Sequence, residues 1–66
     1  MSPKQFAMKL KRLRDDQGMT QEALAKMVHV SRGYLSRLEM GRHDPPLSLL
    51  RRLAKVLRVK VAQLVE

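Results

Sequence analysis

Small, polar and basic side chains share one face of a helical pattern over residues 31–40, SRGYLSRLEM. On a wheel of about 100° per residue, the leucines of this stretch point one way. Gly33, Ser36 and Arg37 point broadly the other way. Arginine can donate two hydrogen bonds to guanine O6 and N7, serine bonds less selectively, and glycine lets the backbone come close. This open face therefore suits the major groove of DNA, which is wide enough to admit one helix.

The overall charge agrees with a polyanionic partner. Fourteen Lys and Arg against six Asp and Glu leave a formal charge of +8 on 66 residues. A small folded domain this basic typically binds nucleic acid, an anionic membrane or an acidic protein. The chain is short for a self-sufficient core and has no cysteine, so apolar packing must supply its stability.

Enzymatic chemistry finds little support in the sequence. There is no Gly-rich phosphate loop, no cluster of metal ligands and no nucleophile with a base close in sequence. His29 and His43 are too far apart to suggest a local metal site, and the adjacent Asp15 and Asp16 diverge on a helix rather than share a site. We expect no enzyme activity, no metal and no cofactor.

An anionic membrane is a less favoured partner than nucleic acid. No apolar run approaches the roughly 20 residues of a membrane span, and the N-terminal MSPKQFAMKLKRLRDD lacks an apolar signal core. The stretch LSLLRRLAKVLRVKV is basic and amphipathic, as in helices that lie on anionic lipid, but its apolar face is needed to close the core. The sequence predicts no membrane association and a cytoplasmic location.

Helical spacing and stop signals divide the chain into five short helices. Four of the predicted helices span residues 3–17, 31–40, 47–57 and, as one final turn, 61–65. The remaining helix begins at residue 20 and ends at the tight connection before residue 31. Gly18 and Gly41 end helices, and Pro45 with Pro46 makes the preceding segment a loop. The side chains predicted to face inward include Phe6, Leu10, Leu13, Leu24, Ala25, Val28, Leu35, Leu38, Leu47, Leu50, Leu53, Ala54 and Leu57. Residues 1–66 are thus predicted to form a single all-α domain.

The stretch TQEALAKMVHVSRGYLSRLEMG, residues 20–41, resembles the helix-turn-helix of the phage-repressor and Cro-like family, the XRE-type regulators. The similarity continues through PPLSLLRRLAKVLRVKVAQL and covers nearly the whole chain from about Lys9. It implies a compact five-helix, lambda-repressor-like DNA-binding domain. The motif occupies residues 21–40, and its second helix enters the major groove.

The resemblance also assigns roles to individual residues. Base reading is implied for Ser31, Arg32, Gly33, Ser36 and Arg37. Contacts to the DNA backbone are implied for Gln21, Tyr34, Arg42 and His43. For Tyr34 a second interpretation stays open, in which the ring packs beside the motif and the hydroxyl faces water.

Two further features follow from the same resemblance. Arg14 and Glu39 match positions that form a partly buried ion pair in some relatives. His29 and Arg58 stand where relatives commonly have glycine. Such sites can need a positive φ, which costs a non-glycine residue some free energy, and the sequence leaves open whether these two residues adopt it.

The sequence and its resemblance thus indicate a sequence-specific, double-stranded DNA-binding transcriptional regulator. The resemblance implies a homodimer on a palindromic operator; repression is expected, and activation is left open. Candidate interface residues are Val59, Val61, Leu64 and Val65, with Leu49 and Val56 as an added apolar shoulder. Whether these side chains form an interface or complete the monomer core is left open by the sequence. The alternative function is an antitoxin or co-regulator whose main role is to bind a partner protein.

Overall fold

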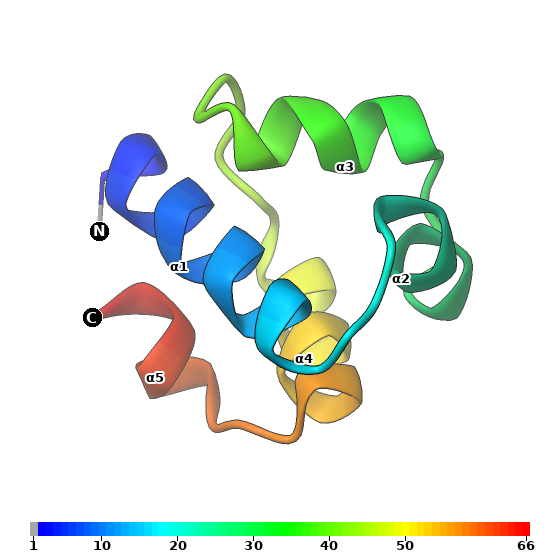
Figure 1. The fold of residues 1–66 in the computed structure, drawn as a ribbon. Coiled ribbons are helices and arrows are strands. Elements are labelled where there is room, and N and C mark those ends of the chain that lie inside the picture. The colour runs from blue at the N-terminus through cyan, green and yellow to red at the C-terminus, as the bar shows by residue number, and fades with distance from the viewer. Residues whose placement is uncertain (1) are drawn as a thin grey trace.

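Residues 2–66 are described by a computed structural model, in which helices surround one apolar core (Figure 1). The helices are α1 (Pro3–Asp16), α2 (Gln21–Met27), α3 (Arg32–Glu39), α4 (Leu47–Leu57) and α5 (Val61–Val65). No strand occurs within these residues, so the all-α prediction is confirmed. Figure 1 shows α1 passing between α3 on one side and α4 with α5 on the other.

Hydroxyl side chains set the starts of the first three helices. Ser2, Thr20 and Ser31 each accept a hydrogen bond from the amide of the third helical residue, at 3.0–3.1 Å. Each bond satisfies a helix-terminal N–H that has no partner within the helix, and such a cap typically contributes about 1 kcal/mol. Ser31 therefore determines where α3 begins and how its first turn is presented.

Left-handed backbone at four positions ends helices and makes the turns. Gly18 and Gly41 have φ of 67° and 76°. The structure settles the open question at His29 and Arg58, whose φ values of 63° and 59° are also positive. Gly41 has a second reason to be glycine, because a Cβ there would lie 3.3 Å from the Cα of Lys4. The turn after α3 thus packs directly on the first turn of α1.

The core draws on every helix. Its most deeply buried large side chains are Phe6, Leu10, Leu24, Val28, Leu35, Leu38, Leu49, Leu53, Leu57 and Leu64. On α4 the prediction was wrong at two positions, because Leu47 is 55% exposed while Leu49 is only 1% exposed. Leu47 is the first residue of the helix, and side chains lean toward the helix N-terminus, so this one extends past the edge of the core. Leu49 lies about 40° from Leu53 on the wheel and falls inside the buried stripe.

The C-terminal residues mainly complete the monomer. Leu64 is 1% exposed and belongs to the core, so it offers no surface to a second chain. Val59, Val61 and Val65 are half-buried and pack against the same core, which leaves part of each side chain on the surface. The Nζ of Lys9 on α1 donates to the backbone carbonyl of Glu66 and holds the end of the chain beside α1.

A polar network joins α1, α2 and α3 at their common junction. Arg14 Nε donates to Glu39 Oε2 at 2.7 Å and its Nη2 donates to Oε1 at 3.0 Å. Arg14 Nη1 donates to the carbonyl of Met19 at 2.6 Å, and Gln21 Nε2 donates to Glu39 Oε1 at 3.0 Å. The hydrogen bond to Glu39 outweighs burial and raises the pKa of Arg14, so the guanidinium stays charged. Both ends of the ion pair are therefore satisfied.

We predict that Glu39→Ala lowers the free energy of unfolding by about 3 kcal/mol, the lower end of the range for breaking a buried ion pair. The loss arises because the Arg14 side chain, 9% exposed, keeps its charge without its carboxylate partner. Thermal and urea unfolding measure this change. Asp15→Ala is the matched control, because Asp15 also pairs with Arg14 (3.2 Å) but is 56% exposed. Its effect should stay within about 0.5 kcal/mol, and equal losses in the two variants would contradict the prediction.

Candidate nucleic-acid interface

Helix α3 separates an apolar face from a polar face. Leu35 and Leu38 are fully buried against the core, where α3 packs on α1 and α2. Arg32, Gly33 and Arg37 are exposed on the outer side. Figure 1 shows α3 along one edge of the molecule with its outer side uncovered. The core therefore holds α3 by one face and leaves the other free for contact.

The predicted base-reading residues all lie in or next to α3. Ser31 and Arg32 are exposed at its start, and Ser36 is half-buried in its middle. Ser31 uses its Oγ to cap the amide of Tyr34 at 3.0 Å, so its hydroxyl is engaged within the helix. Its position at the first turn remains accessible, while its hydroxyl serves the helix cap.

Arg37, Tyr34 and His43 form a cluster that connects α3 to the following loop. Arg37 Nε donates to His43 Nε2 across 3.3 Å. The imidazole of His43 stacks on the ring of Tyr34, with centroids 5.6 Å apart and planes inclined by 24°. His43 thereby steers the Arg37 guanidinium along the exposed side of α3. The pattern of residue types gave no signal for this arrangement, because the loop conformation brings His43 back onto the helix.

Gly33 leaves space at the first turn of α3. A Cβ built at this position would meet only the Arg37 Nη1, at the ordinary contact distance of 3.5 Å. Its φ is not in the left-handed region, so the fold itself does not require glycine here. The missing side chain instead lets another molecule approach the helix backbone closely.

Gln21 has a partner that sequence reasoning missed. It opens α2 and is half-buried, and its Nε2 donates to Glu39. Eighteen positions separate these residues, so no local pattern indicated the bond. Any contact that Gln21 makes with DNA must use its other amide atoms, and the residue links such a contact to the buried ion pair.

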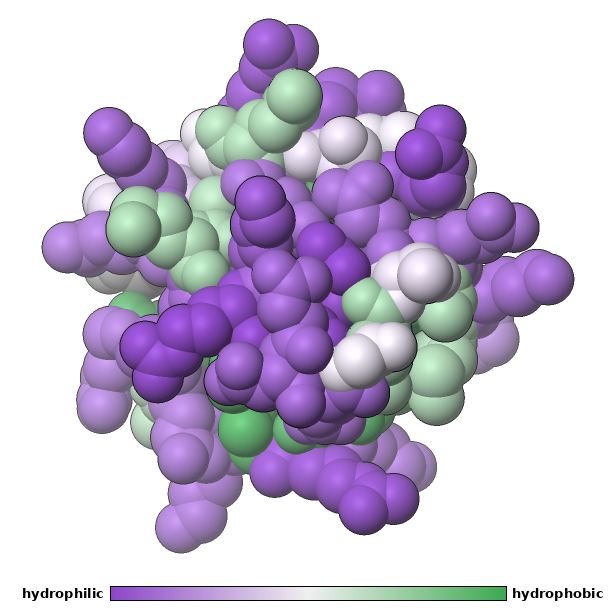
Figure 2. Space-filling view, viewed as in Figure 1, coloured by the Kyte–Doolittle hydropathy of each residue, from purple (hydrophilic) through white to green (hydrophobic). Residues whose placement is uncertain are grey.

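The surface around α3 is positive and mostly polar, with Met40 at the end of the helix as its exposed apolar side chain. Arg32, Arg37 and Arg42 are exposed, and the ion pairs within residues 2–66 involve only Arg14. Glu39 is the one acidic residue of α3, and Arg14 occupies its carboxylate. In the view of Figure 2 most of the surface is hydrophilic and the hydrophobic patches are small and separate. Such a surface favours a phosphate-rich partner.

Residues 2–66 show neither a membrane-spanning helix nor a metal-binding cluster. The described helices include none with the length and apolar character that crossing a bilayer requires. The same residues include no group of three or more His, Cys, Asp or Glu placed to hold a metal ion.

A short helix, a tight turn and a second helix held only by its inner face define a helix-turn-helix DNA-binding domain. The family model described as helix-turn-helix matches residues 10–64, and the chain belongs to this family of XRE-type transcriptional regulators. The resemblance noted from the sequence is thereby confirmed.

Known proteins support the assignment over most of the chain. An uncharacterized HTH-type transcriptional regulator of Methanocaldococcus jannaschii is 43% identical over 53 residues, which are 80% of each chain. The immunity repressor protein of Bacillus phage phi105 is 35% identical over 57 residues, 86% of this chain but only 40% of the repressor. The crystal structure of the restriction-modification controller protein C.AhdI of Aeromonas hydrophila superposes with a TM-score of 0.90 at 29% identity, covering 94% of both chains. The family and these relatives are regulators, not enzymes.

We predict that Gly33→Ala separates folding from DNA binding. Replacing glycine within a helix by alanine stabilises it by roughly 0.5–1 kcal/mol, so the melting temperature should stay the same or rise. Affinity for DNA should fall by about tenfold, equal to about 1.4 kcal/mol, because a methyl group then stands where a base edge approaches. Fluorescence anisotropy with a labelled duplex measures the affinity. Unchanged affinity would mean that the backbone of α3 does not approach DNA at Gly33.

Proposed function

We propose that this chain is a sequence-specific double-stranded DNA-binding regulator that inserts α3 into the major groove. The base-reading residues proposed are Ser31, Arg32, Gly33, Ser36 and Arg37. The arginines supply bidentate donors for guanine, Ser36 supplies a short polar contact, and Gly33 permits close approach. Binding uses non-covalent contacts only.

The observation that carries this proposal is the Arg37–His43–Tyr34 cluster. Arg37 is exposed, yet its Nε is held at 3.3 Å by His43, which in turn stacks on Tyr34. A side chain restrained before binding loses less conformational entropy when it meets a base edge. Solubility alone would not favour holding an exposed arginine in one orientation. The restraint supports a role for Arg37 in reading a base.

Phosphate contacts position the helix in the groove. Arg42 and His43 lie in the loop after α3 and are exposed, and Tyr34 is half-buried beside them. Gln21 lies at the start of α2, where its remaining amide N–H is available to a phosphate oxygen. These groups neutralise or hydrogen-bond the backbone and fix the register, while the outer face of α3 supplies the sequence information.

We further propose that two copies bind one palindromic operator. A single α3 of eight residues reads few base pairs, whereas a two-fold dimer reads two half-sites about one helical turn apart. The proposed interface consists of Val59, Val61 and Val65, the half-buried valines around α5. Leu64 and Leu49 are omitted because both belong to the core, and Val56 faces a different surface.

Repression is the proposed outcome, in the cytoplasm, by occlusion of a promoter. The support is the similarity to the phage immunity repressor. The 57 matched residues are 86% of this chain and therefore include the whole helix-turn-helix motif. A domain of this size bound in the major groove competes directly with other proteins for the same DNA.

The operator is tested by selecting bound duplexes from a random DNA pool and titrating the enriched sequence at two salt concentrations. We predict a palindrome with half-sites about 10 base pairs apart, bound less tightly at higher salt because phosphate contacts release counterions. Arg37→Ala should cost about 1–3 kcal/mol and relax one position of each half-site. Ser36→Ala should act on a neighbouring position with a smaller effect.

The control for this experiment is Lys11→Ala, which removes one positive charge from the exposed side of α1. It should weaken binding to all sequences slightly and equally. If Arg37→Ala behaves in the same way, Arg37 contributes only charge. Salt-sensitive binding with no enriched sequence would contradict sequence-specific recognition altogether.

The dimer is tested by sedimentation with the operator duplex. We predict two chains on each palindrome and, for Val65→Asp, occupancy of single half-sites with the same fold, because a carboxylate in an apolar interface loses its hydration. Circular dichroism and the melting temperature verify that the variant is folded. A single wild-type chain on each palindrome would exclude the dimer.

A further inference from the structure

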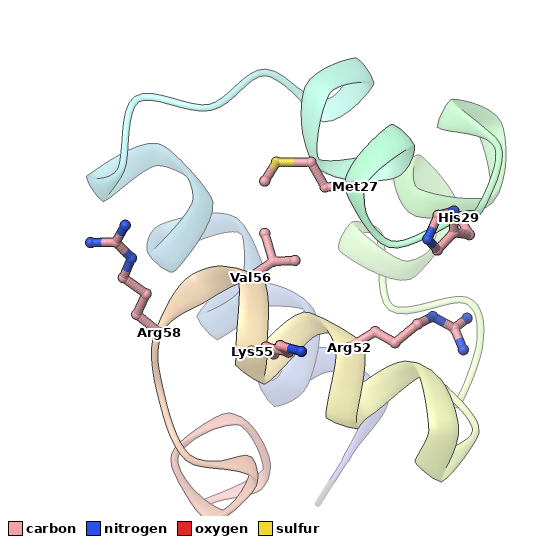
Figure 3. A pocket seen from close by; sticks show the side chains of 6 residues that line it. All are labelled: Met27, His29, Arg52, Lys55, Val56 and Arg58. Atoms are coloured by element: carbon pink, nitrogen blue, oxygen red, sulfur yellow. The ribbon is translucent and has the colours of Figure 1, made fainter.

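A groove of about 490 Å³ lies between α2 and the C-terminal half of α4, lined by Met27, His29, Arg52, Lys55, Val56 and Arg58 (Figure 3). Its volume lies within the ~300–1,000 Å³ of typical ligand pockets. Four of its six lining residues are basic and none is acidic. None of them belongs to the proposed DNA-reading set.

The floor of the groove is apolar. Met27 is 52% exposed although methionine is hydrophobic, and Val56 is only half-buried. Figure 3 shows the Met27 and Val56 side chains pointing toward each other across the gap between α2 and α4. An apolar side chain of a partner that buried these two surfaces would make binding more favourable.

The basic rim is built at a cost to the backbone. His29 and Arg58 have φ of 63° and 59°, and both are exposed. Glycine adopts this conformation freely, whereas for other residues it costs about 1 kcal/mol or more of folding free energy. Both strained residues line the same groove, so the backbone strain coincides with its basic lining.

The Arg52 side chain is held in place before any partner binds. Its Nε donates to the carbonyl of Val28 at 3.0 Å, which joins α4 to the turn after α2. The two terminal nitrogens are left to donate to an incoming carboxylate. Because the guanidinium is already fixed, an ion pair formed there loses less side-chain entropy than one with a free arginine.

The α4 side of the groove is set apart from the DNA-reading side. Figure 1 shows α3 and the C-terminal half of α4 at opposite sides of the molecule, with α1 between them. A duplex held against the outer face of α3 therefore leaves Lys55, Val56 and Arg58 accessible. DNA phosphates would explain the basic rim but not the apolar floor, whereas a protein segment uses both.

We propose that this groove binds an acidic protein segment while α3 binds DNA. One apolar side chain of that segment sits between Met27 and Val56, and flanking Asp or Glu carboxylates pair with Arg52, Lys55 and Arg58. The surface would let the DNA-bound regulator contact a second protein, and it gives a location to the partner-binding function that the sequence left open. This inference does not depend on which operator is read.

The test is selection of random peptides on the immobilised chain, followed by anisotropy with the enriched peptide. We expect peptides that combine Asp or Glu with a large apolar residue. Two variants that each remove two positive charges are then compared, Lys55→Gln/Arg58→Gly at the groove and Arg37→Gln/Arg42→Gln beside α3. Arg58→Gly also relieves the positive φ, so the groove variant should be at least as stable as the wild type.

The groove variant should lose peptide affinity by about fivefold or more and keep DNA affinity within about threefold. The α3 variant should show the reverse pattern, with DNA binding lost and peptide binding kept. Equal loss of peptide binding in both variants would mean that binding depends on the net charge of the chain and not on the groove, and would overturn the proposal. Loss of DNA affinity in the groove variant would assign the groove to phosphate instead, and a selection without acidic peptides would exclude it as an acidic-segment site.

Discussion

The ion pair between Arg14 and Glu39 is the interaction on which the arrangement of the first three helices depends. Both side chains are nearly removed from water, 9% and 3% exposed, so each charge needs its partner. The pair joins the last turn of α1 to the last residue of α3, and Met19 and Gln21 complete its hydrogen bonds. Because α2 starts at Gln21, the same network fixes the angle between the two motif helices.

This junction explains why the outer face of α3 can stay polar. The helix is held by Leu35 and Leu38 on its inner side, by Glu39 at its end and by the Ser31 cap at its start. With both ends and one face secured, the remaining face needs no contact with the rest of the chain. Gly33 adds no packing there and Arg37 is restrained by a loop residue, His43, rather than by the core.

Two of the basic surfaces differ in character. Around α3 the arginines stand beside small and polar residues, which suits base edges and phosphates. Between α2 and α4 the basic groups surround exposed Met27 and half-buried Val56, which suits a protein side chain flanked by carboxylates. The positive φ at His29 and Arg58 occurs only at the second surface, so the backbone strain of the non-glycine residues in residues 2–66 is concentrated there.

The sequence by itself determined the helices and the burial of Leu35 and Leu38, and its resemblance to the family singled out His29 and Arg58 as positions where relatives have glycine. The helices and their inner faces depend on a 3.6-residue period and on glycine and proline stop signals, which act over a few positions. Only the tertiary structure decided that Leu49 is buried and Leu47 exposed, that Leu64 completes the core, and that Gln21 bonds to Glu39. It also brought His43 onto Arg37 and assembled the groove from α2, its following turn and α4. The groove and the Gln21 bond join residues that are 18 or more positions apart in the sequence. His43 reaches Arg37 only because of the path of its loop. The packing angles between helices and the conformations of loops decide these features, and local periodicity does not encode either.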